Sequence, residues 1–183
     1  MFRMLGILVF VIAIIKFVLP LILAGIIGTA IYVSAQSEQQ QENKQQQSKE
    51  YKTIKIGNQV LMSENLNYNV TGSKCYKNNP KNCTRCGRLY DWSTAKNACP
   101  QGWRLPTSNE WKVLASNAGF SSLTCGYGTA DGNFYNFSNY SYWWSSSEKN
   151  FNNAYFLSID DNGNVHRNHL DKNLLFSVRC VKN

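Results

Sequence analysis

The sequence contains no cluster of basic residues, although its formal net charge is +8. The 19 Lys and Arg residues are spread over 183 positions, and no window of the sequence is rich in them. Surfaces that bind nucleic acids usually concentrate such charge in a patch or a stripe. We therefore expect no nucleic-acid partner, and the scattered charge indicates only a mildly basic surface.

Histidine is also scarce, since His166 and His169 are its only occurrences. Both lie on or near one predicted strand, and no Ser or Cys can be paired with either of them as a nucleophile. Cys83 and Cys86 form a CxxC, but zinc would require a second such pair and a redox motif a βαβ context. The sequence therefore predicts a protein that is not an enzyme and holds no zinc.

Charge is nearly absent from residues 4–33, where Lys16 is the only charged side chain. Two interpretations of residues 1–35 remain open. Residues 17–33 can span the bilayer as an apolar helix, with Lys16 on the cytoplasmic side. Alternatively, the segment is a signal peptide that is cleaved after Ala35. Both predict an exported chain, which is anchored in the cell envelope in the first case and secreted in the second.

Residues 36–50, QSEQQQENKQQQSKE, contain no apolar side chain. A segment of this kind cannot offset the entropy that ordering costs, so we expect a Gln-rich linker that is flexible or partly helical. One globular domain is expected over residues 51–183. Its six cysteines, behind an apolar N-terminus, indicate an oxidised domain outside the cytoplasm.

The remaining pattern predicts an α+β domain with two short helices, a twisted antiparallel sheet and long loops. One helix is expected over 93–98, and a second from Thr107 or Ser108 to about 118, where Thr107 and Glu110 form a capping box. Residues 121–140, rich in Gly, Asn, Ser and aromatics, are expected to form a long loop. The expected strands are a hairpin within 51–61, then 142–146, 154–160, 165–168 and 175–181.

Five blocks occur in order along the domain: IGNQVLMSENLNY, CYKNNPKNC, GRLYDWSTAKNACPQGWRLPTSNEW, YWWSSSE and FSVRCVKN. Together they resemble the Fibrobacter succinogenes major paralogous domain, a family of exported bacterial proteins, over nearly all of residues 53–183. The resemblance implies a C-type lectin-like fold, in which two helices flank a twisted sheet. It also implies association with a cell surface and, in the usual interpretation, with carbohydrate.

Six cysteines allow 15 sets of pairings. The resemblance implies a disulfide between Cys99 and Cys180, and the short loop between Cys75 and Cys83 favours a second. Cys86 stands where the family usually has an aromatic residue, and Cys125 lies in the variable loop. These two cysteines are left once the other four are paired, so we expect a third disulfide between them.

Sugar-binding C-type lectins hold calcium with Glu-Pro-Asn and Trp-Asn-Asp motifs, and neither string occurs here. Oxygen ligands for calcium could come from Asp160, Asp161, Asn162 and Asn164. The same run, with Asn162-Gly163 between alternating residues, is first of all a hairpin turn. We therefore expect no cofactor, with calcium at this turn as the alternative.

The aromatic residues suggest where a ligand would bind. Trp143 and Trp144 are neighbours on one predicted strand, so one should point inward and the other outward. An outward ring can stack on a sugar or enter a partner's pocket, whereas packing within the core is the simpler interpretation. The candidate ligand-binding residues, beside the 121–140 loop, are Trp143, Trp144, Glu148, Tyr155 and Arg167.

The function predicted from these features is that of a membrane-tethered, non-catalytic module for binding or adhesion at the cell surface. Its partner would be a polysaccharide or another surface protein, and the N-terminal helix would contact the membrane. The alternative is a structural subunit of a surface assembly or filament that packs through protein–protein contacts.

Overall fold

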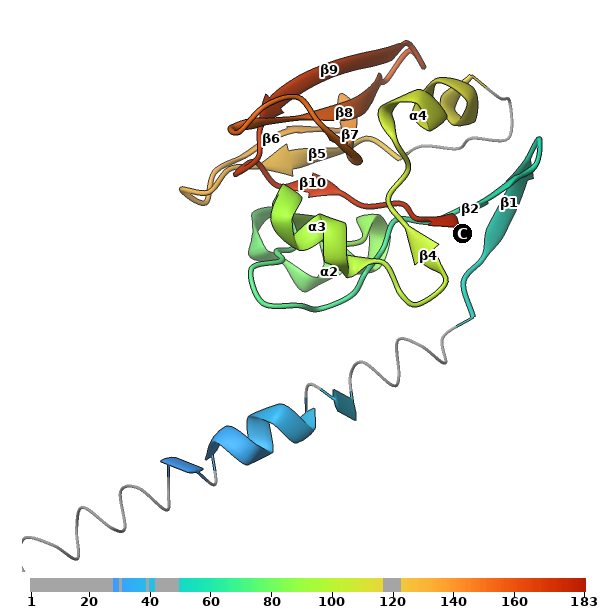
Figure 1. Ribbon diagram of the computed structural model, residues 1–183. Coiled ribbons are helices and arrows are strands. Elements are labelled where there is room, and N and C mark those ends of the chain that lie inside the picture. The colour runs from blue at the N-terminus through green and yellow to red at the C-terminus, as the bar shows by residue number, and fades with distance from the viewer. Residues whose placement is uncertain (1–27, 30, 39, 42–49, 117–122) are drawn as a thin grey trace, which may run out of the picture. The chain divides into compact units, whose positions relative to one another are not determined.

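The computed structural model describes residues 28–29, 31–38, 40–41, 50–116 and 123–183 (Figure 1). The chain divides into two units, Met1–Ser48 and Lys49–Asn183. In the first unit the described residues are helical and exposed, including those of the expected linker. Among the described residues, no helix is long and apolar enough to cross a membrane. Most of the predicted anchor or signal peptide lies outside the described residues.

The second unit is α+β, as the sequence predicts, and its strands form two sheets (Figure 1). The four-stranded sheet has the order β1 (Thr53–Ile56), β2 (Gln59–Met62), β11 (Val181–Lys182) and β4 (Trp103–Arg104). The central path of the seven-stranded sheet is β3 (Leu89–Tyr90), β10 (Phe176–Ser177), β7 (Tyr140–Glu148), β5 (Cys125–Gly128) and β6 (Phe134–Phe137). Beyond β7 follow β8 (Asn153–Asp160) and β9 (Val165–Asp171).

The larger sheet is mixed, so the prediction of an antiparallel sheet is wrong in part. Strands β10 and β5 both pair with β7 in parallel, through Ser177 opposite Trp143 and Gly126 opposite Ser141. Turn signals in a sequence predict hairpins between neighbouring strands, and these are antiparallel. Parallel pairing joins segments that are distant along the chain, for which the sequence gives no local signal.

The predicted loop over residues 121–140 also contains regular structure. Strands β5 and β6 pair as an antiparallel hairpin, with Cys125 opposite Phe137 and Gly128 opposite Phe134. Glycines in β5 and an asparagine in β6 conceal the usual alternation of apolar and polar residues. Pairing with β7 stabilises these short strands, and that contribution is tertiary.

Three α-helices and one turn of 3-10 helix, η1 (Tyr76–Asn78), are present within residues 50–116. Helices α3 (Trp92–Ala98) and α4 (Ser108–Ala115) agree with the prediction, and Thr107 and Glu110 form the predicted capping box at α4. Helix α2 (Pro80–Cys86) was not expected, because its seven residues show no apolar period. Asn79 caps it by accepting a hydrogen bond from the backbone N–H of Lys81.

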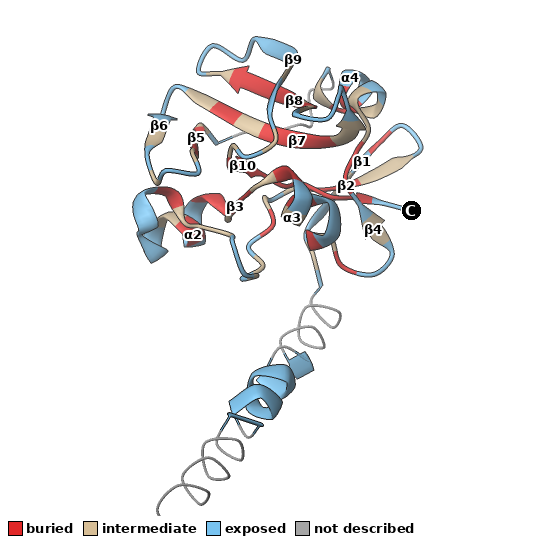
Figure 2. Ribbon diagram, turned by 60° about the vertical axis from the view of Figure 1, so that its left-hand side comes forward, coloured by how far each residue is buried: buried red, intermediate tan, exposed pale blue. Residues whose placement is uncertain are grey.

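The core extends over both faces of β7, as the buried segments in Figure 2 show. Trp143 and Trp144 point to opposite faces. Trp143 packs in one cluster with Trp111 of α4, and Trp144 packs in another with Trp92 of α3. Both side chains are 0% exposed, so the prediction that one of them faces outward is wrong. A helix covers each face, and neither tryptophan reaches solvent.

Three disulfides join Cys75 to Cys83, Cys86 to Cys125 and Cys99 to Cys180, in the predicted pairing. The first two fasten α2, at Cys83 and Cys86, to η1 and to β5. The third joins the end of α3 to the chain just before β11. Because the last pair is separated by 81 residues, it closes the part of the domain from the end of α3 to the chain before β11.

Candidate functional site

The aromatic platform expected at Trp143 and Trp144 is part of the core. Each indole N–H donates a hydrogen bond inside the domain, from Trp143 to Asn65 Oδ1 at 2.8 Å and from Trp144 to the Tyr90 carbonyl at 2.9 Å. With the rings buried and the N–H groups paired, neither residue can stack on an external ligand. Their role is to hold β7 between α3 and α4.

The other three candidate residues lie at the surface, but they contact different partners. Glu148 accepts a hydrogen bond from Lys172 in an ion pair. This bond holds the pKa of the Glu148 carboxyl group below its usual value. The Tyr155 ring meets His169 edge-on, at 5.8 Å between centroids. Arg167 donates to the Ser108 carbonyl at 3.2 Å. Their role in binding stays a prediction.

The run that could supply calcium ligands forms the hairpin turn between β8 and β9. The Asp160 carboxylate accepts hydrogen bonds from the backbone N–H groups of Asn162 and Asn164, at 3.0 and 2.7 Å. It also accepts one from the Asn164 side chain at 2.8 Å. These donors account for the lowered pKa of Asp160, the Asn164 side chain contributing most. No group of three or more His, Cys, Asp or Glu side chains suited to a metal occurs among the described residues.

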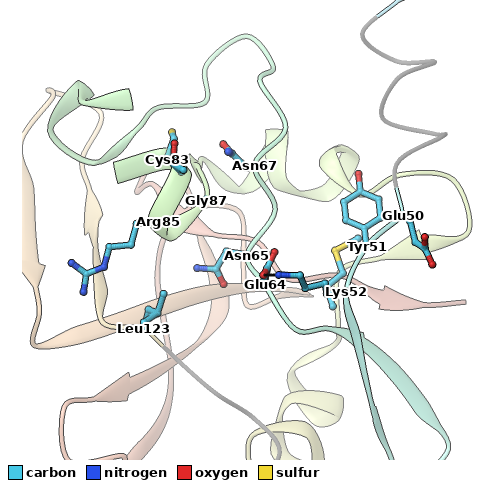
Figure 3. Close-up of a pocket in the computed structure, with 12 residues that line it drawn as sticks. Glu50, Tyr51, Lys52, Glu64, Asn65, Asn67, Cys83, Arg85, Gly87 and Leu123 are labelled. Carbon is cyan, nitrogen blue, oxygen red and sulfur yellow. Dashed lines mark hydrogen bonds and ion pairs between the residues drawn. The ribbon is translucent and has the colours of Figure 1, made fainter. Parts of the chain in front are cut away.

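A groove of about 470 Å³ lies elsewhere on the domain (Figure 3). Its volume falls within the range of about 300–1,000 Å³ that is usual for ligand sites. Four separate segments meet there: residues 50–52, residues 62–67, the end of α2 with Gly87, and Leu123. The lining is formed by Glu50, Tyr51, Lys52, Met62, Glu64, Asn65, Asn67, Cys83, Thr84, Arg85, Gly87 and Leu123.

Gly87 allows α2 to end close to the extended segment that forms one wall. Its φ of +73° is in the region that favours glycine. A Cβ atom at this position would lie 2.7 Å from the Leu66 carbonyl oxygen and 2.8 Å from the Asn65 Cβ. Any larger residue would therefore push the two walls of the groove apart.

Asn65 connects the groove to the core. Its Oδ1 accepts hydrogen bonds from Trp143 Nε1 at 2.8 Å and from Arg179 Nε and Nη2 at 3.2 and 3.0 Å. Its Nδ2 donates to the Cys86 carbonyl at 2.8 Å. Arg179 is 3% exposed, and its burial lowers the pKa of the guanidinium to about 10. The amide of Asn65 is thus committed to the fold rather than to a ligand.

The groove has polar groups along its rim, and Glu50, Asn67 and Arg85 are exposed there. Tyr51 is half-buried, and its ring also meets Trp103 edge-on, at 6.2 Å between centroids. Burial, with a smaller contribution from Tyr68, raises the pKa of Tyr51, so its hydroxyl is protonated at neutral pH. Lys52 and Glu64 form an ion pair at 2.8 Å. This combination of a ring with hydrogen-bonding groups suits a hydroxyl-rich molecule.

Comparison with protein families identifies the domain. The family model described as the Fibrobacter succinogenes major domain matches residues 54–119 and 115–182. The chain belongs to this family. The match confirms the resemblance that the five ordered blocks of sequence suggested. Comparisons with curated proteins and with solved structures found no match.

Most of the groove lies inside the segments that match the Fibrobacter succinogenes major domain, whereas Glu50, Tyr51 and Lys52 precede them. No local pattern of residues indicated this site. Its residues come from segments far apart along the chain, and none forms a known motif. The nearest signal is the pair of cysteines in α2, whose disulfides fix the wall that carries Arg85.

Proposed function

We propose that this chain is an exported, non-catalytic module that binds carbohydrate at the cell surface. The observation that carries the proposal is the groove, where a tyrosine ring lies beside exposed amide, carboxylate and guanidinium groups. Sugars are bound in proteins by stacking on aromatic rings and by hydrogen bonds to planar polar side chains. The groove offers both, on a domain that three disulfides stabilise.

A C-type lectin-like fold is part of the proposal. Two features support it: α3 and α4 contribute to the clusters on opposite faces of β7, and Cys99 at the end of α3 is joined to Cys180 near the C-terminus. Export is supported by the disulfides, which persist in oxidising compartments. Residues 1–35 would anchor the chain in the envelope, or release it if cleavage follows Ala35. The mass of the intact protein distinguishes the two, because cleavage gives a chain that begins at Gln36.

The binding proposal is tested by a glycan array or polysaccharide pull-down with the full-length, oxidised protein. Retention of a glycan is expected, and Tyr51→Ala should weaken it about tenfold because the ring is lost. Tyr155→Ala is the matched control, since it removes the same side chain from the surface that the sequence predicted. A loss confined to Tyr155→Ala would move the site to β8, and retention of no glycan at all would refute the proposal.

One observation favours the alternative of a structural subunit in a surface assembly. Strand β9 pairs only with β8 among the described residues, and it exposes Val165 and Leu170. An unpaired edge of this kind can add a strand from another chain. Sedimentation of the full-length protein distinguishes the two functions: self-association that His169→Pro abolishes, with no glycan retained, would favour assembly. The His169 N–H is bonded to Asn168 Oδ1 at 2.8 Å and not to β8, so this change blocks the free edge without breaking the pairing with β8.

A further inference from the structure

The two ends of the groove carry different chemistry (Figure 3). Glu50 and the Tyr51 ring lie at one end, and Arg85 and Leu123 lie at the other. Between them are Asn67 and the ion pair of Lys52 with Glu64. A ligand that spans the groove therefore meets an aromatic ring at one end, and at the other it reaches Arg85, whose guanidinium points outward from α2 and away from Asn65.

Arg85 lines one end of the groove, and its positive charge is open to a ligand at the outer edge of that end. It is exposed and forms no ion pair within the described part of the chain. Lys52, by contrast, is paired with Glu64 at 2.8 Å. The nearby guanidinium of Arg179 is buried, donates to Asn65 and lies 5.4 Å from the centre of the Trp143 ring. Arg179 adds positive charge behind the groove without reaching into it.

The backbone that carries Arg85 is held in place on both sides. Cys83 and Cys86, two positions before it and one after, are bonded to Cys75 and Cys125. The guanidinium carbon lies 5.7 Å from the centre of the Phe137 ring, which supports the side chain from one side. Because the backbone beneath this cation is already ordered, a ligand orders only the exposed side chain when it binds.

We infer that the groove binds an acidic polysaccharide, with a sugar carboxylate on Arg85 and a sugar ring stacked on Tyr51. The inference rests on the proposed carbohydrate function and specifies its ligand class. A guanidinium group pairs with a carboxylate through two parallel N–H···O bonds, a geometry that neutral sugars cannot use. Asn67 and Glu50 form hydrogen bonds with hydroxyl groups of the same polysaccharide. Arg85 is thus the residue that selects uronic acid polymers.

The test measures binding of the full-length, oxidised protein to immobilised polygalacturonate, alginate and hyaluronan, each beside its carboxyl-reduced form. We expect retention on at least one acidic polymer, about tenfold weaker binding to its reduced form, and a similar loss in Arg85→Gln. Binding should also weaken as salt is raised. Lys81→Gln is the matched control, because it removes the same charge from α2 outside the groove and should bind as the original protein does.

Thermal unfolding of both variants shows whether α2 is intact, so that a loss of affinity is not a loss of fold. The inference is overturned if Arg85→Gln binds the acidic polymer as tightly as the original protein, or if no acidic polymer is retained. Retention of neutral glycans alone would leave the carbohydrate function standing and remove only the acidic specificity. Retention of no glycan of either kind would refute both.

Discussion

Asn65 shows at the scale of one residue how the core and the groove depend on each other. Its amide oxygen accepts from the buried N–H groups of Trp143 and Arg179, and its amide nitrogen donates to the Cys86 carbonyl. No feature of the block SENLNY reveals this role, because all three partners are distant in sequence. The residue contributes to the groove by fixing its floor.

Asn65→Ala should therefore be strongly destabilising. The substitution removes the acceptor that the Trp143 indole and the Arg179 guanidinium share, and a hydrogen bond to a charged group contributes about 1.5–3 kcal/mol. We expect the free energy of unfolding to fall by about 2–4 kcal/mol, measured by urea denaturation. Asn69→Ala, at an exposed position of the same segment, should leave it unchanged. Equal stability of the two variants would contradict the role assigned to Asn65.

At the scale of elements, the sequence predicted the helices that have local signals and missed the elements that distant parts of the chain stabilise. The capping box predicted α4, because caps act within one turn. Helix α2 and strands β5 and β6 were missed, since disulfides and pairing with β7 stabilise them from outside. The missed elements carry or support the Arg85 end of the groove.

Helix α4 gives a prediction about acid stability. Glu110 accepts from the Thr107 N–H in the capping box and forms two hydrogen bonds with Arg104, at 2.7 and 2.8 Å. The bonds from Arg104 contribute most to lowering the pKa of Glu110 from 4.5 to about 2. Because the pKa is lower in the folded state, ionised Glu110 stabilises the fold above pH 4.5, and this contribution is lost as the pH falls towards about 2.

Glu110→Gln should lower the free energy of unfolding by about 1–2 kcal/mol at pH 7, because the ion pair and part of the cap are lost. The difference from the original protein should shrink as the pH is lowered from 4.5 towards 2, where Glu110 itself becomes neutral. Urea denaturation at several pH values measures both effects. Glu148→Gln, which removes an exposed ion pair, should give no comparable loss. A difference that stayed constant with pH would refute the assignment.

For the whole molecule, each disulfide contributes more to stability the longer the chain segment that it closes, with a dependence on the logarithm of the length. In the chain-entropy model, pairs separated by 81, 39 and 8 residues contribute about 4.5, about 3.9 and about 2.6 kcal/mol. The Cys99–Cys180 bond should therefore matter most. It joins the end of α3 to the chain just before β11.

The paired substitution Cys99→Ala with Cys180→Ala should lower the urea midpoint more than Cys75→Ala with Cys83→Ala. The second pair is the matched control, since it removes the same atoms but opens only the short loop at η1 and α2. Equilibrium unfolding of both variants, followed by tryptophan fluorescence, gives the comparison. A greater loss for the short-loop pair would mean that native-state contacts, not loop entropy, determine the ranking.

The sequence by itself determined the family, the α+β class, the helix caps and the cysteine pairing. Most of these features depend on residues close together in the chain or on ordered blocks that one protein family shares, and the Cys86–Cys125 pair followed because the other two pairs left only these cysteines. Only the tertiary structure decided that Trp143 and Trp144 are both buried and that a groove lies between Tyr51 and Arg85. The physical reason is that exposure depends on what packs against a residue. Here the packing partners are α3, α4 and α2, and local patterns in the sequence do not show against which strands these helices pack.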